Sequence, residues 1–371
     1  MTTVISVIGT RPEVIKMAPV IRELERHPTQ VRNAVVSTGQ HRQMLDQALS
    51  AFGIRPDLDL NLMRPNQTLS QLTASLFKAL DQTFEQLRPD WVLAQGDTTT
   101  VLVTAIVCHY QRIRFGHVEA GLRSHDKWRP FPEELNRRVA DIVADAYFAP
   151  TTQAADTLRR EGCPPEAIFV TGNTVIDALL AAADRPFDWA ASRLPLLPPD
   201  ARLVLITAHR RESFGQAFRD LCEAIRELAS LVETQDVHFI YPVHLNPNVR
   251  APVREILTGL PRVHLIEPVD YFTMAQLMKR ASLVLTDSGG VQEEAPTFGV
   301  PVLVMRDKTE RSEGVDAGVA RLVGTGRERI VAESRQVLAG GAGLQRSPGA
   351  SIYGDGHAAE RIVRVLLHGR M

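Results

Sequence analysis

The chain contains little cysteine, no long apolar run and no leader-like segment, and each shortage excludes a class of protein. Its three cysteines, Cys108, Cys163 and Cys222, are widely separated, so we expect neither a disulfide framework nor a thiolate zinc site. No apolar run reaches the roughly 18 residues that a membrane span needs. No basic segment precedes the first apolar run at Val4. We therefore expect a cytoplasmic protein with no membrane partner.

Lysine is also scarce, because only five of the 42 basic residues are lysines. Arginine supplies most of the positive charge, and its planar guanidinium suits two-pronged phosphate binding. The formal net charge of −1 leaves no overall field to attract nucleic acid, so no nucleic-acid partner is expected. A content of 44% hydrophobic and 23% charged residues is typical of a globular protein. The length of 371 residues predicts about two domains.

Short apolar runs alternate with longer helical patterns along the whole chain. We expect strands at residues 4–8, 34–37, 91–94, 115–118, 146–148, 168–170, 203–207, 238–243, 263–266, 283–285, 302–305 and 321–323. We expect helices near residues 13–26, 42–51, 69–87, 99–110, 133–144 and 358–367. Nearly continuous apolar strands that alternate with helices predict parallel sheets covered on both faces. The predicted fold is therefore α/β, with two doubly wound domains.

A proline-rich stretch at residues 186–199 interrupts the alternation before the second set of strands starts. We place the crossover between the domains between about Thr171 and Pro199. We see no internal repeat and no low-complexity tract. Ligands of open α/β sheets bind beyond the carboxyl ends of the strands. The residues that directly follow each expected strand are therefore the candidates for a site.

The most informative stretch is Thr-Asp-Ser-Gly-Gly-Val-Gln-Glu-Glu-Ala-Pro at residues 286–296. A strand that stops at Ser288, Gly289 and Gly290 and opens into a helix presents backbone N–H groups to a phosphate. Glu293 and Glu294 follow one turn later, within reach of sugar hydroxyls. Phosphate beside carboxylate favours a nucleotide-sugar as ligand. Taken alone, the motif could also be an ordinary strand–helix turn with a serine cap.

Basic residues flank the turn after the first strand, at residues 9–16. Arg11 and Lys16 lie near the start of a helix and are candidates to hold an anion. The alternative is two solvated residues on a surface helix. The dinucleotide fingerprint Gly-x-Gly-x-x-Gly is absent here, which argues against bound NAD.

Three acids follow strands or open a helix in the first domain. Asp97 follows the third strand, Glu119 ends the fourth, and Glu133 opens the next helix with Arg137 four positions later on one face. Each acid could be a helix cap or an ion-pair partner, and Asp97 in particular could be a plain cap. Because this domain shows no metal-type histidine spacing, we interpret the three acids as a general acid/base set.

The second domain repeats the arrangement with histidine and arginine. His209 directly follows a strand and stands beside Arg210, which favours a role near a phosphate. His244 ends the next strand in the same way. Arg311 lies in a mixed-charge loop after a later strand and could close over a nucleotide; the alternative is a solvated loop.

Together these stretches resemble the non-hydrolysing UDP-N-acetylglucosamine 2-epimerases. The resemblance covers nearly the whole chain, from Gly9 to about Arg361. The matching motifs are Gly-Thr-Arg-Pro-Glu at 9–13, Thr-Gly-Gln-His at 38–41, Gly-Asp-Thr at 96–98, His-Val-Glu-Ala-Gly-Leu-Arg at 117–123, Pro-Glu-Glu at 132–134, Thr-Gly-Asn-Thr at 171–174, His-Arg-Arg-Glu at 209–212 and Asp-Ser-Gly-Gly at 287–290.

The resemblance implies a glycosyltransferase-B fold, with two Rossmann-like domains that face each other across a cleft. The domains implied are residues 1–172, carrying the catalytic acids, and 173–354, binding UDP. Residues 355–371 would form a helix that crosses back to the first domain. The resemblance also implies a homodimer and no cofactor or metal.

Matched position by position, the family's catalytic roles fall on Asp97, Glu119, Glu133, Arg137 and His209. Its UDP- and substrate-binding roles fall on Arg11, Lys16, His244, Ser288, Gly289, Gly290, Glu294 and Arg311. A second, activating UDP-sugar site is compatible with Gln40, Gln43 and Arg210, although Asn66 stands where an arginine is expected.

The implied reaction is reversible inversion at C2 of UDP-GlcNAc to give UDP-ManNAc, as a step towards cell-surface polysaccharide. It would proceed by elimination of UDP, leaving 2-acetamidoglucal, followed by re-addition. The alternatives are a hydrolysing epimerase, a glycosyltransferase of the same fold and a non-catalytic UDP-sugar sensor. The acid trio argues against a sensor. The sequence leaves open the exact acetamido sugar, the pathway and which acid removes the C2 proton.

Overall fold

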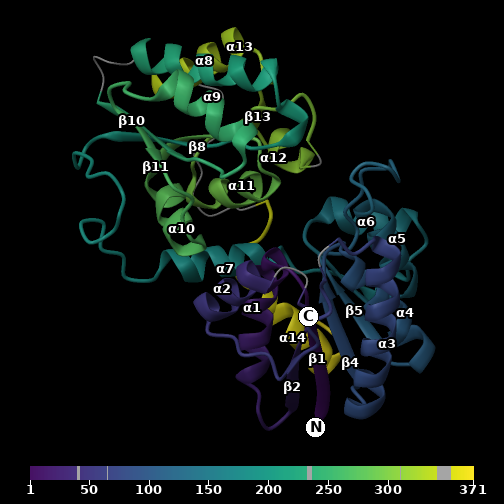
Figure 1. Ribbon diagram of the computed structural model, residues 1–371. Helices are drawn as coiled ribbons and strands as arrows, with labels where there is room; N and C mark the ends of the chain where they lie inside the picture. The colour runs from purple at the N-terminus through teal and green to yellow at the C-terminus, as the bar shows by residue number, and fades with distance from the viewer. Residues whose placement is uncertain (40–41, 65, 232–235, 310, 341–351) are drawn as a thin grey trace. The chain divides into compact units, whose positions relative to one another are not determined.

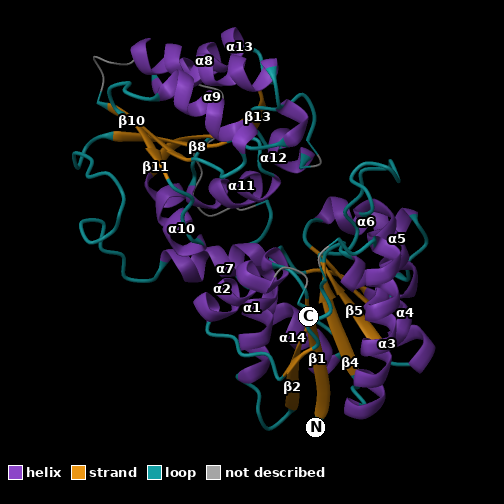
Figure 2. Ribbon diagram, viewed as in Figure 1, coloured by secondary structure: helices purple, strands orange, loops and turns teal. Residues whose placement is uncertain are grey.

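The computed structural model describes residues 1–39, 42–64, 66–231, 236–309, 311–340 and 352–371. The chain forms two compact units, which we call the N-terminal unit (Met1–Ala178 with Tyr353–Met371) and the C-terminal unit (Leu179–Ile352) (Figure 1). Each is built on one parallel sheet with helices on both faces (Figure 2). The predicted α/β class with two doubly wound domains is therefore confirmed.

The N-terminal unit has seven parallel strands in the order β3-β2-β1-β4-β5-β6-β7. The strands are β1 (Thr2–Ile8), β2 (Val31–Ser37), β3 (Leu58–Asp59), β4 (Trp91–Gln95), β5 (Arg114–Val118), β6 (Ala146–Ala149) and β7 (Ile168–Val170). The helices are α1 (Arg11–Glu25), α2 (Arg42–Phe52), α3 (Leu69–Leu87), α4 (Thr99–Gln111), α5 (Glu133–Val143), α6 (Thr152–Arg160) and α14 (Ala358–His368), while α7 (Thr174–Ala183) runs on into the C-terminal unit.

The C-terminal unit has six parallel strands in the order β10-β9-β8-β11-β12-β13. The strands are β8 (Arg202–Thr207), β9 (Val237–Pro242), β10 (Val263–Ile266), β11 (Ala281–Thr286), β12 (Val302–Val304) and β13 (Ala320–Leu322). The helices are α8 (Gln216–Leu231), α9 (Pro247–Leu257), α10 (Tyr271–Arg280), α11 (Gly289–Glu294), α12 (Ser312–Asp316) and α13 (Arg327–Leu338).

The strand order reverses once in each sheet, and this is where a doubly wound domain opens a crevice. β1 lies between β2 and β4, and β8 lies between β9 and β11. The chain leaves β1 towards β2 and β4 towards β5, and it leaves β8 towards β9 and β11 towards β12. A crevice therefore forms beyond the carboxyl ends of β1 and β4, and another beyond those of β8 and β11. In the N-terminal unit that edge carries the turns at Gly9 and Gly96. In the C-terminal unit it carries His209 after β8 and Asp287 after β11.

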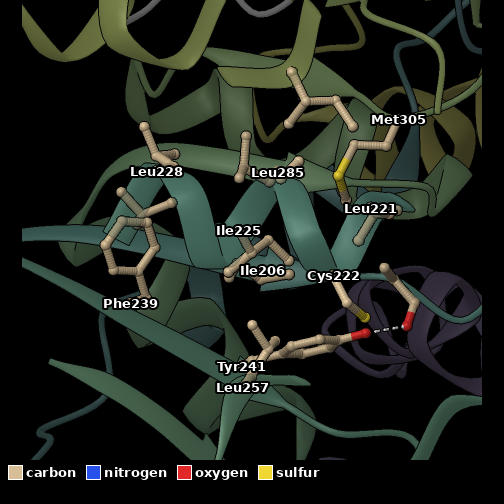
Figure 3. Packing of buried hydrophobic residues seen from close by; sticks show 14 of the residues in the cluster. Ile206, Leu221, Cys222, Ile225, Leu228, Phe239, Tyr241, Leu257, Leu285 and Met305 are labelled. Carbon is tan, nitrogen blue, oxygen red and sulfur yellow. Dashed lines mark hydrogen bonds between the residues drawn. The ribbon is translucent and has the colours of Figure 1, made fainter. Parts of the chain in front are cut away.

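One of the buried clusters of the C-terminal unit lies between its sheet and α8. Leu221 and Ile225 of α8 pack with Ile206 of β8 in one buried cluster (Figure 3). Tyr241 of β9 is buried in the same cluster, and its hydroxyl donates to the carbonyl of Ala208 at 2.7 Å. The core therefore fixes the backbone that leads into His209.

Helix α14 belongs to the N-terminal unit although it follows the whole C-terminal unit in the chain. It packs on α1, as Figure 1 shows in yellow and purple, and buries Ile362 and Leu366. Its first turn is held by the Asp177 carboxylate, which accepts the N–H groups of Ala358 at 3.2 Å and Ala359 at 2.8 Å. Burial raises the pKa of Asp177 to about 6.

The expected strands and helices are present, with small differences at their ends. β1 begins at Thr2 and β11 at Ala281, each two residues earlier than expected. β3 was not expected, because its two exposed residues form no apolar run. Among the described residues, no helix is long and apolar enough to cross a membrane.

Candidate active site

The turn after β1 requires glycine. A Cβ on Gly9 would lie 2.5 Å from the Thr38 hydroxyl oxygen and 2.8 Å from that of Thr100, closer than real Cβ atoms come. Arg11, the first residue of α1, is exposed just beyond this turn. The carboxyl edge of β1 is therefore closely packed beneath an accessible basic side chain.

Glu13 is buried behind this turn and links it to the turn after β4. Its Oε2 accepts the N–H groups of Gly9 and Thr10, and its Oε1 accepts the Thr98 hydroxyl at 2.6 Å. Burial raises the pKa of Glu13 to about 7, although these hydrogen bonds lower it. Glu13 was not among the predicted site residues. Its place three residues after Thr10 is a capping-box signal that could have singled it out.

We expect Glu13→Gln to flatten the dependence of stability on pH. Because the folded-state pKa of about 7 exceeds the ordinary 4.5, the native protein binds this proton more tightly than the unfolded chain. This stabilisation is complete below pH 4.5 and is lost as the pH rises through about 7, an effect of about 3 kcal/mol. Denaturant unfolding between pH 5 and pH 8 measures it, with the exposed Glu25→Gln on the same helix as control. If the free energy of unfolding changed equally with pH in wild type and in Glu13→Gln, the shifted pKa of Glu13 would be contradicted.

Glu119, at the end of β5, is held by residues of α1, β4 and β6. Both of its carboxylate oxygens accept from the Lys16 ammonium, at 2.7 and 2.6 Å, and the Gln95 amide donates to Oε2. Its backbone has a φ of 68°, which is unusual for a residue other than glycine, and its N–H donates to the Phe148 carbonyl at 3.0 Å. The structure thus joins two residues predicted separately, Glu119 and Lys16, in one ion pair.

Asp97 is oriented by two neighbours on α5. Its Oδ2 lies 3.2 Å from Nη2 of Arg137, and its carbonyl accepts the Asn136 amide at 2.9 Å. The side chain of Asp97 remains 34% exposed. The cap of α4 is Thr98 and not Asp97, so the alternative of a plain cap does not hold.

Glu133 differs from the other two acids because one of its carboxylate oxygens, Oε2, is buried without a hydrogen-bond partner among the described residues. Although Glu133 and Arg137 are four positions apart on one helix, the described contacts include no ion pair between their side chains. Arg137 contacts only the carbonyl oxygen of Glu133, at 3.4 Å, while its guanidinium lies near Asp97 and, at 3.5 Å, near Glu134. A buried acceptor without a donor is rare in proteins, so this oxygen is available to a donor that is not part of the described chain.

The three carboxylates share one edge of the N-terminal sheet. β4 and β5 are neighbours in register, so Asp97 and Glu119 leave adjacent strands at the same side. Glu133 opens α5, whose Arg137 reaches Asp97 one turn later. This edge therefore gathers negative carboxylates between the cations of Lys16 and Arg137.

In the C-terminal unit, Asp287 organises the turn after β8. Its fully buried carboxylate accepts the N–H groups of His209 at 2.7 Å and Arg210 at 2.8 Å. The His209 ring stays 41% exposed, with Nδ1 3.6 Å from Oδ1 of Asp287, and stacks on His244 with ring centres 5.2 Å apart. Asp287 was not among the predicted site residues. It lies 78 positions from His209, and its place directly after β11, within the Asp-Ser-Gly-Gly motif, could have indicated it.

The Ser-Gly-Gly turn (residues 288–290) follows β11 at the same edge. The Ser288 side chain makes no cap hydrogen bond, so the serine-cap alternative does not hold. A Cβ on Gly290 would meet only Oε2 of Glu294, at 3.9 Å, so the space beside this backbone is open. The Oε1 of Glu294 accepts the Tyr271 hydroxyl at 2.9 Å.

The loop after β12 is tied to α11. Arg311 forms an ion pair with Glu293, and the Thr309 hydroxyl donates to the Gln292 amide oxygen at 2.7 Å. Glu293 is buried. The predicted role of Arg311 towards a nucleotide stays a prediction, and so do the roles of Lys16 and His244.

The residues assigned to an activating site are mostly outside the described part. Gln40 and the side chain of Gln43 are not described, and Arg210 is placed through its backbone bond to Asp287. Among the residues that are described, no three His, Cys, Asp or Glu side chains are grouped so that they could hold a metal ion.

Known proteins resemble this chain over nearly its whole length. Residues 22–367 match the model of the family described as UDP-N-acetylglucosamine 2-epimerase. The chain is 47% identical to the UDP-N-acetylglucosamine 2-epimerase of Escherichia coli K12, with 99% of each protein covered. It is 46% identical to that of Bacillus subtilis, covering 98% of this chain and 94% of the relative.

Solved structures show the same fold. The UDP-GlcNAc 2-epimerase of Neisseria meningitidis, bound to UDP-GlcNAc, aligns with a TM-score of 0.88 at 42% identity, covering 99% of this chain and 100% of the other. The Methanocaldococcus jannaschii enzyme, in complex with UDP-GlcNAc and UDP, aligns with a TM-score of 0.78 at 34% identity, covering 99% of both chains. The glycosyltransferase-B type of fold is therefore confirmed, and the chain belongs to the UDP-N-acetylglucosamine 2-epimerase family.

Proposed function

We propose that this protein interconverts UDP-GlcNAc and UDP-ManNAc by reversible inversion at C2. The observation that carries the proposal is the group of three carboxylates, Asp97, Glu119 and Glu133, at the switch-point edge of the N-terminal sheet. The family and a relative solved with UDP-GlcNAc support this substrate. We further propose that the enzyme works as a homodimer and supplies a precursor of cell-surface polysaccharide.

The reaction we propose is elimination followed by re-addition. The C2 proton is too weakly acidic for direct removal, so the C1–O bond breaks first and UDP leaves with the electron pair. A carboxylate takes the C2 proton, which leaves the C1=C2 double bond of 2-acetamidoglucal. A proton then returns to the opposite face of C2, and UDP re-forms the bond to C1. No atom changes its net oxidation state, so the reaction calls for no hydride carrier.

The carboxylates and the cations would act on opposite charges that develop in this reaction. Breaking the C1–O bond develops positive charge on the sugar ring and negative charge on the pyrophosphate. The carboxylates of the N-terminal unit suit the ring and the proton transfer, with the unpaired Oε2 of Glu133 ready to accept. Arg11, His209, Arg311 and the Ser-Gly-Gly turn suit the leaving UDP. Asp287 would serve by holding the backbone of His209.

Proton NMR of the purified protein with UDP-GlcNAc in D₂O, without added cofactor, tests the proposal. We expect UDP-ManNAc to appear and deuterium to enter C2 of the pooled UDP-sugars. Free ManNAc with UDP would instead identify a hydrolysing epimerase. No change, even with both UDP-sugars present, would contradict the proposal and point to another sugar or to a glycosyltransferase that lacks its acceptor.

A further inference from the structure

His117 is a wholly buried histidine that lies directly beneath the acid cluster. It is the fourth residue of β5, two positions before Glu119, and its side chain is 0% exposed. Nδ1 lies 2.6 Å from Oδ1 of Asp141 on α5, and Nε2 lies 2.7 Å from the carbonyl oxygen of Gly96. No function derived so far uses this ring.

Both neighbours of the ring are acceptors. The Gly96 carbonyl can only accept. The other oxygen of Asp141, Oδ2, also meets donors: it accepts the Gly121 N–H at 3.2 Å and lies 2.7 Å from Nη2 of Arg123. The carboxylate is therefore ionised. A neutral imidazole carries a single N–H and could satisfy one acceptor only, so the ring carries two N–H groups and a positive charge.

The electrostatic surroundings agree with this geometry. Burial lowers the pKa of His117, but the Asp141 carboxylate and the two hydrogen bonds outweigh it and leave the pKa raised. Burial likewise raises the pKa of Asp141, yet His117 and Arg123 bring it below its ordinary value. The remaining groups around the pair are Tyr147 on β6, whose pKa burial raises, and Glu161, which pairs with Arg123.

The carbonyl that His117 holds belongs to the peptide that joins Gly96 to Asp97. Gly96 itself has a φ of 86°. The next two residues of this turn are also held by separate elements, since Asn136 binds the Asp97 carbonyl and Glu13 binds the Thr98 hydroxyl. Three successive residues are thus anchored by β5, α5 and α1, which fixes the backbone that carries the Asp97 carboxylate.

We propose that His117 is a positioning residue for Asp97, acting as a permanently protonated imidazolium that clamps the Gly96 carbonyl to Asp141. This inference rests on the proposed epimerase function, because Asp97 must act on substrate for its position to matter. A shift of the order of 1 Å in a reacting group costs roughly 10²-fold in rate. Loss of the clamp is therefore expected to lower kcat and to leave nucleotide affinity unchanged.

The protonation state is measured first, on the wild-type protein. Nitrogen-15 NMR of histidine-labelled protein resolves the ring nitrogens of the 11 histidines, and the signal missing from His117→Asn identifies His117. We expect both of its nitrogens to stay protonated from pH 6 to pH 9. A neutral tautomer within that range would overturn the proposal. This measurement does not depend on any enzymatic activity.

Kinetics then test the positioning role. We expect His117→Asn to lower kcat for UDP-GlcNAc epimerisation roughly 10²-fold with little change in UDP affinity. Because a single substitution removes the charged partner of Oδ1 on the buried Asp141, the double variant His117→Asn/Asp141→Asn provides a neutral pair that should fold and show the same loss. Glu161→Gln, which removes only the outer partner of Arg123, is the control and should keep wild-type kcat.

The outcomes separate the two proposals. Wild-type kcat in a folded His117→Asn or in the double variant would overturn the positioning role. An equal loss of kcat and of UDP affinity would also overturn it, since a general structural defect would affect both. Failure of wild type itself to epimerise UDP-GlcNAc would refute the proposed function, while the NMR signal would still report the charge on His117.

Discussion

Glu133→Gln is expected to lower kcat for epimerisation by about 10²–10⁴-fold, the usual contribution of a general acid or base. Glutamine keeps the shape of the side chain but cannot take a proton at C2. Glu133 is the cleanest of the three acids to test, because its Oε2 has no partner among the described residues. Glu119→Gln would also unpair Lys16, and Asp97→Asn would disturb Arg137.

Steady-state kinetics with UDP-GlcNAc and titration with UDP measure this effect. UDP affinity should be unchanged, because the proposed nucleotide-binding turn belongs to the other unit. Glu85→Gln replaces an exposed carboxylate on α3 and should keep wild-type kcat. Near-wild-type turnover in Glu133→Gln would remove Glu133 from the chemistry. The same result in Asp97→Asn and Glu119→Gln as well would refute the whole acid/base assignment.

Gly290→Ala is expected to weaken UDP binding by roughly 10–100-fold, and Gly290→Val by more. A phosphate against this backbone accepts charge-assisted hydrogen bonds that contribute about 1.5–3 kcal/mol each, and each 1.4 kcal/mol corresponds to tenfold in affinity. A methyl group at Gly290 would stand where the phosphate approaches. The folded protein itself has room, since the added Cβ meets only Oε2 of Glu294, at 3.9 Å.

Calorimetric titration with UDP and thermal unfolding of the same samples distinguish lost binding from lost structure. Stability should be kept or slightly raised, because alanine is the better helix former at a helical position. Gly326→Ala, at the start of α13 with no atom within 4 Å of an added Cβ, is the matched control in the same unit. Unchanged UDP affinity in Gly290→Ala and Gly290→Val would show that phosphate does not bind at this turn.

The fold was predictable because strands of a parallel sheet that is buried on both faces have continuous apolar sequences. β4 and β11 are examples, because most of their residues are apolar and buried. The rule that ligands gather beyond strand ends then selected Asp97, Glu119 and His209 for the site. Exposed, two-residue β3 carries no such signal and was missed.

The partners within the site were not predictable in the same way. Lys16 and Glu119 are 103 positions apart, and nothing local in either segment indicates that they form an ion pair. His117 lies inside a strand, where a buried histidine is normally structural, so its charge emerges only once Asp141 and Gly96 are seen on its two sides. The i,i+4 spacing of Glu133 and Arg137 indicates a shared helix face but not the partners of the guanidinium, which lies near Asp97 and Glu134.

The place of α14 has a consequence for synthesis on the ribosome. The C-terminal unit interrupts the N-terminal one, so all of its strands are translated before α14 emerges. Until then the surface of α1 that α14 covers is exposed, and Asp177 lacks the two N–H groups it accepts. The N-terminal unit, which is translated first, is thus completed last. While the C-terminal unit is being translated, the nascent chain exposes the apolar face of α1 that α14 later covers.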